Sequence, residues 1–242
     1  MRVLIISDIH ANLAAFEAVL ADAAGKYDFI WFMGDLVGYG PDPNECVNLL
    51  REHDHLALSG NHDWAVLGKL DISGFNPEAK FAIEWTQSIV TDESRTYLDS
   101  LDSITDQEPF TLAHASIRQP VWEYILDRYT AAVNFVFLPS PYGIIGHTHV
   151  PVIYEERGQN SVIQHAPDYD ALVQLNRNRL LINPGSVGQP RDSDPRAAYA
   201  LLDLEAMTWQ FCRVDYDIKR TQIEMRKFNL PERLVSRLSY GW

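Results

Sequence analysis

Short polar motifs follow apolar runs along this chain, and their side chains are of the kinds that bind divalent metals. In chain order the motifs are Asp8-Ile9-His10, Gly34-Asp35, Gly60-Asn61-His62-Asp63, His114 and Gly146-His147-Thr148-His149. Carboxylate, amide and imidazole groups together suit hard-to-borderline divalent ions. Such a series is typical of a two-metal hydrolytic centre assembled from strand ends.

Each motif alone is weak evidence for that chemistry. Asp-x-His occurs by chance, Gly-Asp is an ordinary turn sequence, and Gly-Asn-His-Asp could be a loop whose Asn and Asp bond their own backbone. The whole ordered series, with each motif placed after a strand-like run, is hard to obtain from turn chemistry alone. The inference therefore depends on the set and not on any one member.

The spacing within two motifs predicts how their side chains point. Successive residues of a strand face opposite sides, so residues two apart share a side. We therefore expect Asp8 and His10 to reach one metal together, and the same holds for His147 and His149. The other motifs follow neighbouring strands, and open parallel sheets bind ligands outside the carboxyl ends of their strands.

Alternating strands and helices at the start of the chain predict a parallel sheet with crossover helices. The expected strands are 3–6, 29–33 and 56–58, with helices that follow residues 12 and 42. Asn12 is expected to cap the first helix. Asp42, Pro43 and Glu45 resemble a capping box at the start of the second.

The rest of the chain divides into a helical stretch, a strand-rich stretch and a helical tail. Residues 64–101 are expected to form covering helices, one of which starts at Asn76-Pro77. We expect the later strands to form a second sheet packed on the first, at residues 110–113, 144–145, 150–154, 180–182, 197–202 and 209–214. The tail is expected to be helical, capped by Asp217 and restarted by Pro231.

Composition and charge limit the class of protein. The 242 residues, 46% of them hydrophobic, predict a single domain over residues 1–242. The formal net charge of -13 lacks the basic footprint of proteins that bind nucleic acid, and it disfavours membrane surfaces. The two cysteines, Cys46 and Cys212, form no Cys-x-x-Cys motif, and no apolar run resembles a signal peptide or a membrane span. We expect a cytoplasmic location.

The ordered motifs resemble those of the calcineurin-like metallophosphoesterase superfamily, in particular its small bacterial and archaeal phosphodiesterase branch, over nearly the whole chain. The resemblance implies an α/β (α+β) fold, a four-layer α-β-β-α sandwich of two mixed sheets flanked by helices. It also implies a dinuclear centre in which Asp35 bridges both ions. The remaining ligands would be Asp8, His10 and His149 for one ion, and Asn61, His114 and His147 for the other.

The resemblance also implies the ions and the reaction. It favours two manganese ions, while iron, zinc, nickel and magnesium are also compatible with nitrogen and oxygen ligands. A hydroxide activated by both ions would attack phosphorus, and His62, which the ligand set leaves over, would protonate the leaving oxygen. Asp63 is a weaker candidate to orient His62, because adjacent side chains on extended backbone diverge.

The residues after Asp35 bear on the substrate class. In the Ser/Thr protein phosphatases of the superfamily the Gly-Asp motif continues into Asp-Arg, whereas here it continues into Leu36-Val37-Gly38-Tyr39-Gly40-Pro41. The missing arginine favours phosphodiesters or anhydrides, which carry less charge than phosphomonoesters. Arg118 or Arg191 could supply a phosphate clamp from another loop. Tyr39 either stacks on a substrate base or packs over its own loop, and Ser186 is a candidate supporting residue near the centre.

The sequence thus predicts a metal-dependent phosphodiesterase whose partner is a small phosphorylated molecule, with nucleotides among the candidates. Three alternatives remain open. They are a dinucleoside polyphosphate or nucleotide pyrophosphohydrolase, a small-molecule phosphomonoesterase, and a catalytically silent scaffold that binds protein. The scaffold is the least favoured because His62 and every inferred ligand are present.

Overall fold

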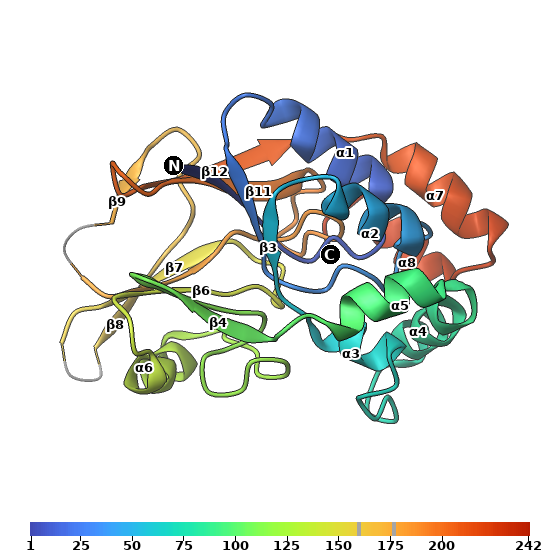
Figure 1. Ribbon diagram of the computed structural model, residues 1–242, viewed down its shortest axis with the longest axis horizontal. Helices are drawn as coiled ribbons and strands as arrows, with labels where there is room; N and C mark the ends of the chain where they lie inside the picture. Colours follow the sequence, from blue (N-terminus) through green and yellow to red (C-terminus); the bar gives the residue numbers. More distant parts are fainter. Residues whose placement is uncertain (159–160, 176–177) are drawn as a thin grey trace.

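Two mixed β-sheets face each other across a shared apolar layer in the computed structural model, which describes residues 1–158, 161–175 and 178–242 (Figure 1). The first sheet has the order β3-β2-β1-β11-β12-β9. Its strands are β1 Arg2–Ile6, β2 Phe29–Phe32, β3 His55–Ala57, β9 Val173–Gln174, β11 Ala197–Asp203 and β12 Thr208–Val214. β1, β2 and β3 run parallel, and β11 runs antiparallel to β1.

The second sheet has the order β4-β5-β6-β10-β7-β8. Its strands are β4 Ile104–Gln107, β5 Phe110–Ala113, β6 Tyr142–Ile144, β7 Val152–Glu156, β8 Val162–His165 and β10 Leu180–Asn183. β5, β6 and β10 are parallel, so the loops that follow β5 and β6 leave the same edge of the sheet.

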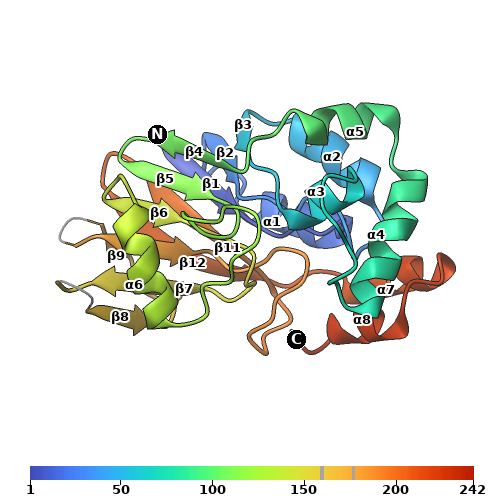
Figure 2. The same ribbon diagram turned by 90° about the horizontal axis from the view of Figure 1, so that it is seen from below.

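Helices cover the outer faces of both sheets. They are α1 Leu13–Asp22, α2 Pro43–Arg51, α3 Asn61–Val66, α4 Pro77–Ile89, α5 Asp92–Asp99, α6 Arg128–Phe137, α7 Ile218–Lys227 and α8 Glu232–Arg237. α1 packs on the first sheet at β11 and β12, and α6 packs on the second at β7 and β8 (Figure 2). One apolar cluster fills the space between the sheets, and one lies under the helices of each side. The expected four-layer sandwich is confirmed.

The helix starts follow from capping side chains. Asn12 accepts a hydrogen bond from the backbone N–H of Ala15, and Asn76 and Asp217 cap α4 and α7 in the same way. The predicted caps are confirmed at these helices. The capping box expected at α2 is wrong, because the Asp42 side chain makes no capping bond although Pro43 does begin the helix.

Several elements differ from the expected arrangement, among them β4, β8 and β9, which the sequence analysis did not predict. β11 and β12 join the first sheet through β1 and do not belong to the second, which makes the first sheet mixed. Residues 128–137 form α6, which the sequence analysis missed. This helix is rich in aromatic and β-branched residues, which are typical of strands, and it buries few of its positions. None of the described helices has the length and apolar character of a membrane span.

Candidate metal centre

The side chains predicted to bind metal lie together at the carboxyl ends of the strands. Asp8 and His10 follow β1, Asp35 follows β2, and Asn61 opens the helix after β3. His114 follows β5, and the pair His147 and His149 follows β6. Each of these side chains is at most 4% exposed. The parallel strands of both sheets therefore deliver their terminal loops to one buried location.

The backbone at these residues is left-handed and not extended. The φ angles are 54° at Asp8, 50° at His10, 58° at Asp35, 64° at His147 and 61° at His149. The expectation that strand pleating aligns each pair is therefore wrong, since β1 ends at Ile6 and β6 ends at Ile144. Tight turns bring the side chains together instead. Such conformations are uncommon for residues other than glycine, and they gather where function requires a fixed geometry.

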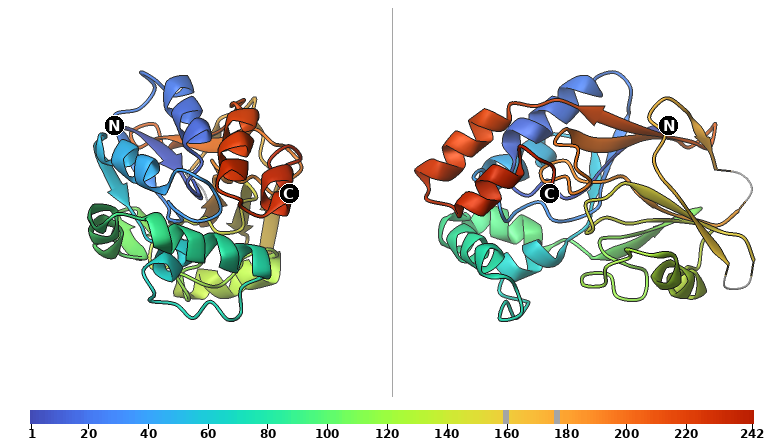
Figure 3. Two further views of the ribbon diagram at one scale, coloured as in Figure 1. Left: turned by 90° about the vertical axis from the view of Figure 1, so that its right-hand side faces the viewer. Right: turned by 180° about the vertical axis from the view of Figure 1, so that it is seen from behind.

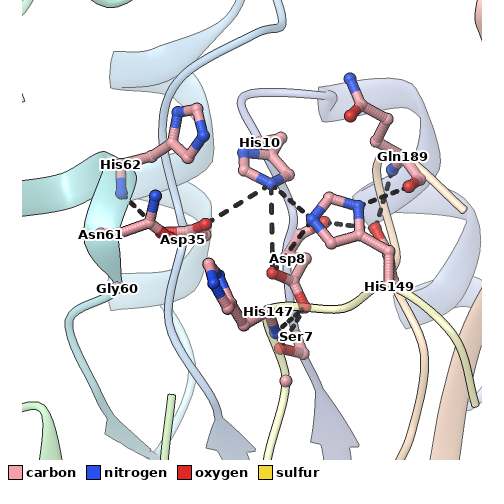
Figure 4. A network of polar contacts seen from close by, with 12 residues as sticks. Ser7, Asp8, His10, Asp35, Gly60, Asn61, His62, His147, His149 and Gln189 are labelled. Atoms are coloured by element: carbon pink, nitrogen blue, oxygen red, sulfur yellow. Dashed lines mark hydrogen bonds and ion pairs between the residues drawn. The ribbon is translucent and has the colours of Figure 1, made fainter. Parts of the chain in front are cut away.

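One group of potential ligands surrounds His10 (Figure 4). Its Nε2 lies 3.1 Å from Nε2 of His149 and 3.6 Å from Oδ2 of Asp35. Oδ1 of Asp8 lies 3.3 Å from Nε2 of His149. These are the four side chains that the resemblance assigned to one ion.

A second group shares Asp35 with the first. Nε2 of His114 lies 3.4 Å from Oδ2 of Asp35 and 3.3 Å from Oδ1 of Asn61. His147 offers a ring nitrogen within 4.8 Å of ligand atoms of Asp35 and His114. One carboxylate oxygen, Oδ2 of Asp35, thus faces both groups, which is the position that a bridging ligand must occupy.

Backbone carbonyls orient three of the imidazole rings. Nδ1 of His10 lies 3.2 Å from the carbonyl oxygen of Val37, and Nδ1 of His149 lies 2.6 Å from that of Gln189. Nδ1 of His114 lies 2.8 Å from another carbonyl, that of Met33. A carbonyl only accepts, so each Nδ1 carries a proton, and each Nε2 presents a lone pair to the centre when its ring is neutral. Such outer hydrogen bonds are typical of histidines that bind metal.

Several buried atoms of the centre are left without a favourable partner unless cations bind there. The lone pairs of His10 and His149 face each other at 3.1 Å, and burial lowers the pKa of both rings well below the usual value, so a proton does not separate them. In addition, Oδ1 of Asp8 and Nε2 of His147 are buried without a hydrogen-bond partner. A divalent ion in each group would satisfy these atoms and offset the buried carboxylates.

The pKa values of two of these side chains are shifted by the buried charges around them. Burial raises the pKa of Asp8 to about 7. Burial by itself would lower the pKa of His114, but the adjacent Asp35 carboxylate raises it to about 9. Without cations, the negative charge of the buried carboxylates favours a proton on this cluster. Bound divalent ions would neutralise that charge instead.

Asp63 has a structural role that the sequence analysis missed. Its Oδ2 accepts hydrogen bonds from the backbone N–H groups of Gly60 (2.8 Å) and Asp35 (2.9 Å). Its Oδ1 accepts from those of Leu36 (3.0 Å) and Val37 (3.1 Å). The side chain therefore fixes the turn that carries Asp35 and does not orient His62. The helical spacing of Gly60 and Asp63, three residues apart, was the available signal.

His62 lies beside His10, on the side away from His149 (Figure 4). Its backbone N–H donates to Oδ1 of Asp35 at 2.8 Å, while its ring centroid lies 4.8 Å from that of His10. Its Nδ1 is buried and makes no hydrogen bond, and burial lowers its pKa to about 4. A ring nitrogen of His62 also lies within 4.8 Å of ligand atoms of His10 and Asp35, so the ring is close enough to the centre to contribute to it.

The candidate substrate residues lie in different surroundings. The Tyr39 ring packs against those of His10 and His62, with centroids 4.7 and 4.3 Å away. The Arg191 guanidinium lies 5.8 Å from the Tyr39 ring centroid. Arg118 is engaged elsewhere, since its Nε donates to Oε1 of Glu123 at 2.8 Å. The structure thus brings Tyr39 and Arg191 to the centre and holds Arg118 in an ion pair.

Ser186 supports the centre through the backbone. Its hydroxyl group donates to the carbonyl oxygen of Asp8 at 2.8 Å and accepts from the N–H of Gln189 at 2.8 Å. The carbonyl of Gln189 in turn contacts His149. Ser186 therefore links the turns that carry Asp8 and His149.

Comparisons with known proteins point to one family of proteins. A family model described as calcineurin-like phosphoesterase superfamily domain matches residues 1–207. An uncharacterized protein of Methanocaldococcus jannaschii is 38% identical over 98% of this chain and 97% of its own length. The crystal structure of a metallophosphoesterase from Sphaerobacter thermophilus is 47% identical, with a TM-score of 0.92 over 100% of this chain and 99% of that one. A symmetrical bis(5'-nucleosyl)-tetraphosphatase of Buchnera aphidicola is 28% identical over 51% of this chain and 47% of its own length.

Proposed function

The chain belongs to the calcineurin-like phosphoesterase superfamily, and from that premise we propose that it is a dinuclear metal-dependent hydrolase of small phosphodiesters. One observation carries the proposal. Oδ2 of Asp35 lies between two groups of buried ligand atoms, 3.6 Å from Nε2 of His10 and 3.4 Å from Nε2 of His114. A carboxylate shared in this way suits two-metal hydrolysis, in which the ions lie about 3.5 to 4 Å apart.

The potential ligands would hold the two ions, and the ions would activate the water that attacks phosphorus. One ion would be held by Asp8, His10, Asp35 and His149, and the other by Asp35, Asn61, His114 and His147. When bound, the ions lower the pKa of water to make a nucleophile near neutral pH and offset the charge of the phosphoryl oxygens. Manganese is the ion that we propose, because the resemblance to the superfamily favours it and the nitrogen and oxygen ligands are compatible with it.

His62 is the group that we assign to the leaving oxygen. It is buried beside His10, and its Nδ1 has no partner in the described structure. An anionic phosphoryl group next to the ring favours the protonated imidazole and so counteracts the effect of burial on its pKa. Proton transfer by a positioned imidazole contributes about 10²- to 10⁴-fold in rate.

The surroundings of the centre favour a substrate with little charge at the scissile phosphorus. The loop after Asp35 contributes Tyr39 and no arginine, so a dianionic phosphomonoester lacks a clamp from this loop. Arg191 is the basic group that lies near the centre. The partial similarity to a bis(5'-nucleosyl)-tetraphosphatase supports a second candidate, hydrolysis of a dinucleoside polyphosphate.

Hydrolysis of two model esters tests the reaction. We expect manganese-loaded protein to hydrolyse bis-p-nitrophenyl phosphate with a higher kcat/KM than p-nitrophenyl phosphate. Protein that holds two metal ions and hydrolyses neither ester would contradict the proposal and favour the scaffold alternative.

Variants then separate binding from proton transfer. Asp35→Ala is expected to lose at least one metal ion and activity, because its carboxylate faces both groups. His62→Ala is expected to keep both ions and to slow turnover about 10²-fold or more. His165→Ala is the matched control, since His165 pairs with Glu155 away from the centre. Elemental analysis of each variant measures its metal content. Equal metal loss in the Asp35 and His62 variants would refute the role of His62.

A further inference from the structure

A cavity of about 350 Å³ opens beside the candidate metal centre. Its wall includes Tyr39 and Tyr124, together with Arg191, Arg237 and Trp242. Tyr39 connects the cavity to the centre, because its ring also packs against those of His10 and His62. Tyr124 makes a second connection, with its ring centroid 3.8 Å from that of His147. The cavity and the centre are therefore neighbours that share these two aromatic side chains as a wall.

Two of the three arginines of the cavity wall, Arg191 and Arg237, make no ion pair with an aspartate or glutamate side chain of the described residues. Most arginines of the described chain pair with a carboxylate, and in the same cavity Arg233 lies 3.5 Å from Glu78. Arg191 and Arg237 appear in none of the ion pairs with aspartate or glutamate among residues 1–158, 161–175 and 178–242. This is unexpected for half-buried cations in a chain with a net charge of -13.

The local contacts leave these guanidinium groups partly unsatisfied. Nε of Arg191 is buried without a hydrogen-bond partner, and its Nη2 donates to the neutral Oε1 of Gln189 at 2.9 Å. Nε of Arg237 donates to the main-chain oxygen of Trp242, which is a carboxylate oxygen in the 242-residue chain. Burial and the charge of Arg191 lower the pKa of Arg237 to about 10, so the two cations destabilise each other. An anion between them would remove that cost.

We propose that this cavity is an anion subsite in which Arg191 and Arg237 bind a second phosphate group of the substrate. The inference rests on the proposed function and narrows it to small molecules with two phosphate groups, one at the metal centre and one in the cavity. Planar guanidinium groups bind phosphate oxygens in pairs, which suits this role.

The C-terminal segment supplies half of the subsite. Arg237 ends α8, which packs against α7 (Figure 3), and both helices lie outside the residues 1–207 that the family model matches. Trp242 comes from the same segment. Half of the subsite therefore lies beyond the segment that the family model matches, while Arg191 lies within it. A substrate with a second phosphate group would gain contacts here that the metal ligands alone do not provide.

Calorimetric titration of the manganese-loaded full chain tests the subsite without using catalysis. The probes are methylphosphonate, which has one phosphonate group, and alkane bisphosphonates with one to three carbon atoms between their phosphorus atoms. We expect the best-fitting bisphosphonate to bind about 10- to 100-fold more tightly than methylphosphonate, as expected for added hydrogen bonds to charged groups. Bisphosphonates that bind no more tightly than methylphosphonate would overturn the proposal without any variant.

Variants then assign the effect to Arg237. In Arg237→Met the ratio of the two dissociation constants should fall toward one, and Arg237→Lys should keep part of it. Arg226→Met removes the same charge from α7, where Arg226 pairs with Glu232, and should keep the full ratio. An unchanged ratio in a folded Arg237→Met protein would refute the subsite. Failure to hydrolyse bis-p-nitrophenyl phosphate would count only against the proposed function, because the titration does not depend on turnover.

Discussion

Replacement of Asp63 by Asn is the sharpest test of how the turn after β2 is held. The carboxylate accepts four backbone N–H groups and is fully buried. Burial and the Asp35 charge raise the pKa of Asp63 to about 7, while its N–H donors favour the ionised form. An amide keeps only one oxygen, so two of the four N–H groups would face an NH2 group that cannot accept from them.

The size of the effect follows from those two lost bonds. Hydrogen bonds to charged groups contribute about 1.5 to 3 kcal/mol each, so the loss of two should lower the free energy of unfolding of Asp63→Asn by about 3 to 6 kcal/mol where the carboxylate is ionised. Urea unfolding of metal-free protein above pH 7 measures this difference. Manganese affinity should fall as well, because one of the donors is the N–H of Asp35 itself.

A matched substitution controls for the loss of one negative charge. Asp217 caps α7 by accepting from the N–H of Arg220 at 3.0 Å, and Asn caps a helix about as well as Asp. Asp217→Asn should therefore change the free energy of unfolding by less than about 0.5 kcal/mol. If Asp63→Asn cost less than about 1 kcal/mol and kept its manganese affinity, the turn would not depend on this carboxylate.

Two further predictions concern acid stability and metal removal. The hydrogen bond from Arg118 lowers the pKa of Glu123 from 4.5 to about 2, so Glu123 stabilises the fold above pH 4.5 and loses this effect as the pH falls toward 2. Glu123→Gln should cost about 1 to 2 kcal/mol at pH 7, allowing for the partly exposed Arg118, and the difference in urea unfolding should shrink between pH 4.5 and 2.5. Removal of metal with EDTA should lower Tm, because ions at a hundred times Kd stabilise the fold by about 2.7 kcal/mol. An unchanged Tm would indicate that the buried ligands do not hold ions.

Local sequence signals predicted much of the fold, and long-range pairing accounts for most of what they missed. Apolar runs located β1, β2 and β5, and capping residues located the starts of α1, α4 and α7. No local signal states which strands pair, so the antiparallel pairing of β11 with β1 was not foreseen. α6 was missed because its composition favours strands, although Asp127 caps its start and the helix packs on β7 and β8.

The sequence predicted which side chains form the candidate site, but not the backbone turns and supporting residues that hold them. The identity of the polar side chains was sufficient to place Asp8, His10 and Asp35 together, although the left-handed turns that align them were not foreseen. Asp63 was undervalued because its partners are backbone N–H groups, which a sequence does not display. Arg237 carried no signal at all, since it lies near the end of a mixed-charge tail and meets Arg191 only through the fold.

The glycines of the metal-ligand motifs acquire a different explanation from the structure. Gly60 and Gly146 each precede a predicted ligand, and neither has a positive φ angle. A Cβ at Gly60 would lie 2.1 Å from Oδ1 of Asp35, and one at Gly146 would lie 2.0 Å from Oγ of Ser7, which donates to Asp8. Both distances are too short for any side chain, so these positions need glycine for clearance and not for turn conformation. The close approach at Gly60 is between two loops of the first sheet, and the one at Gly146 is between a loop of the second sheet and the end of β1. Both approaches place loops that carry predicted ligands against Asp8 and Asp35, so a larger residue at either glycine would push the ligand groups apart.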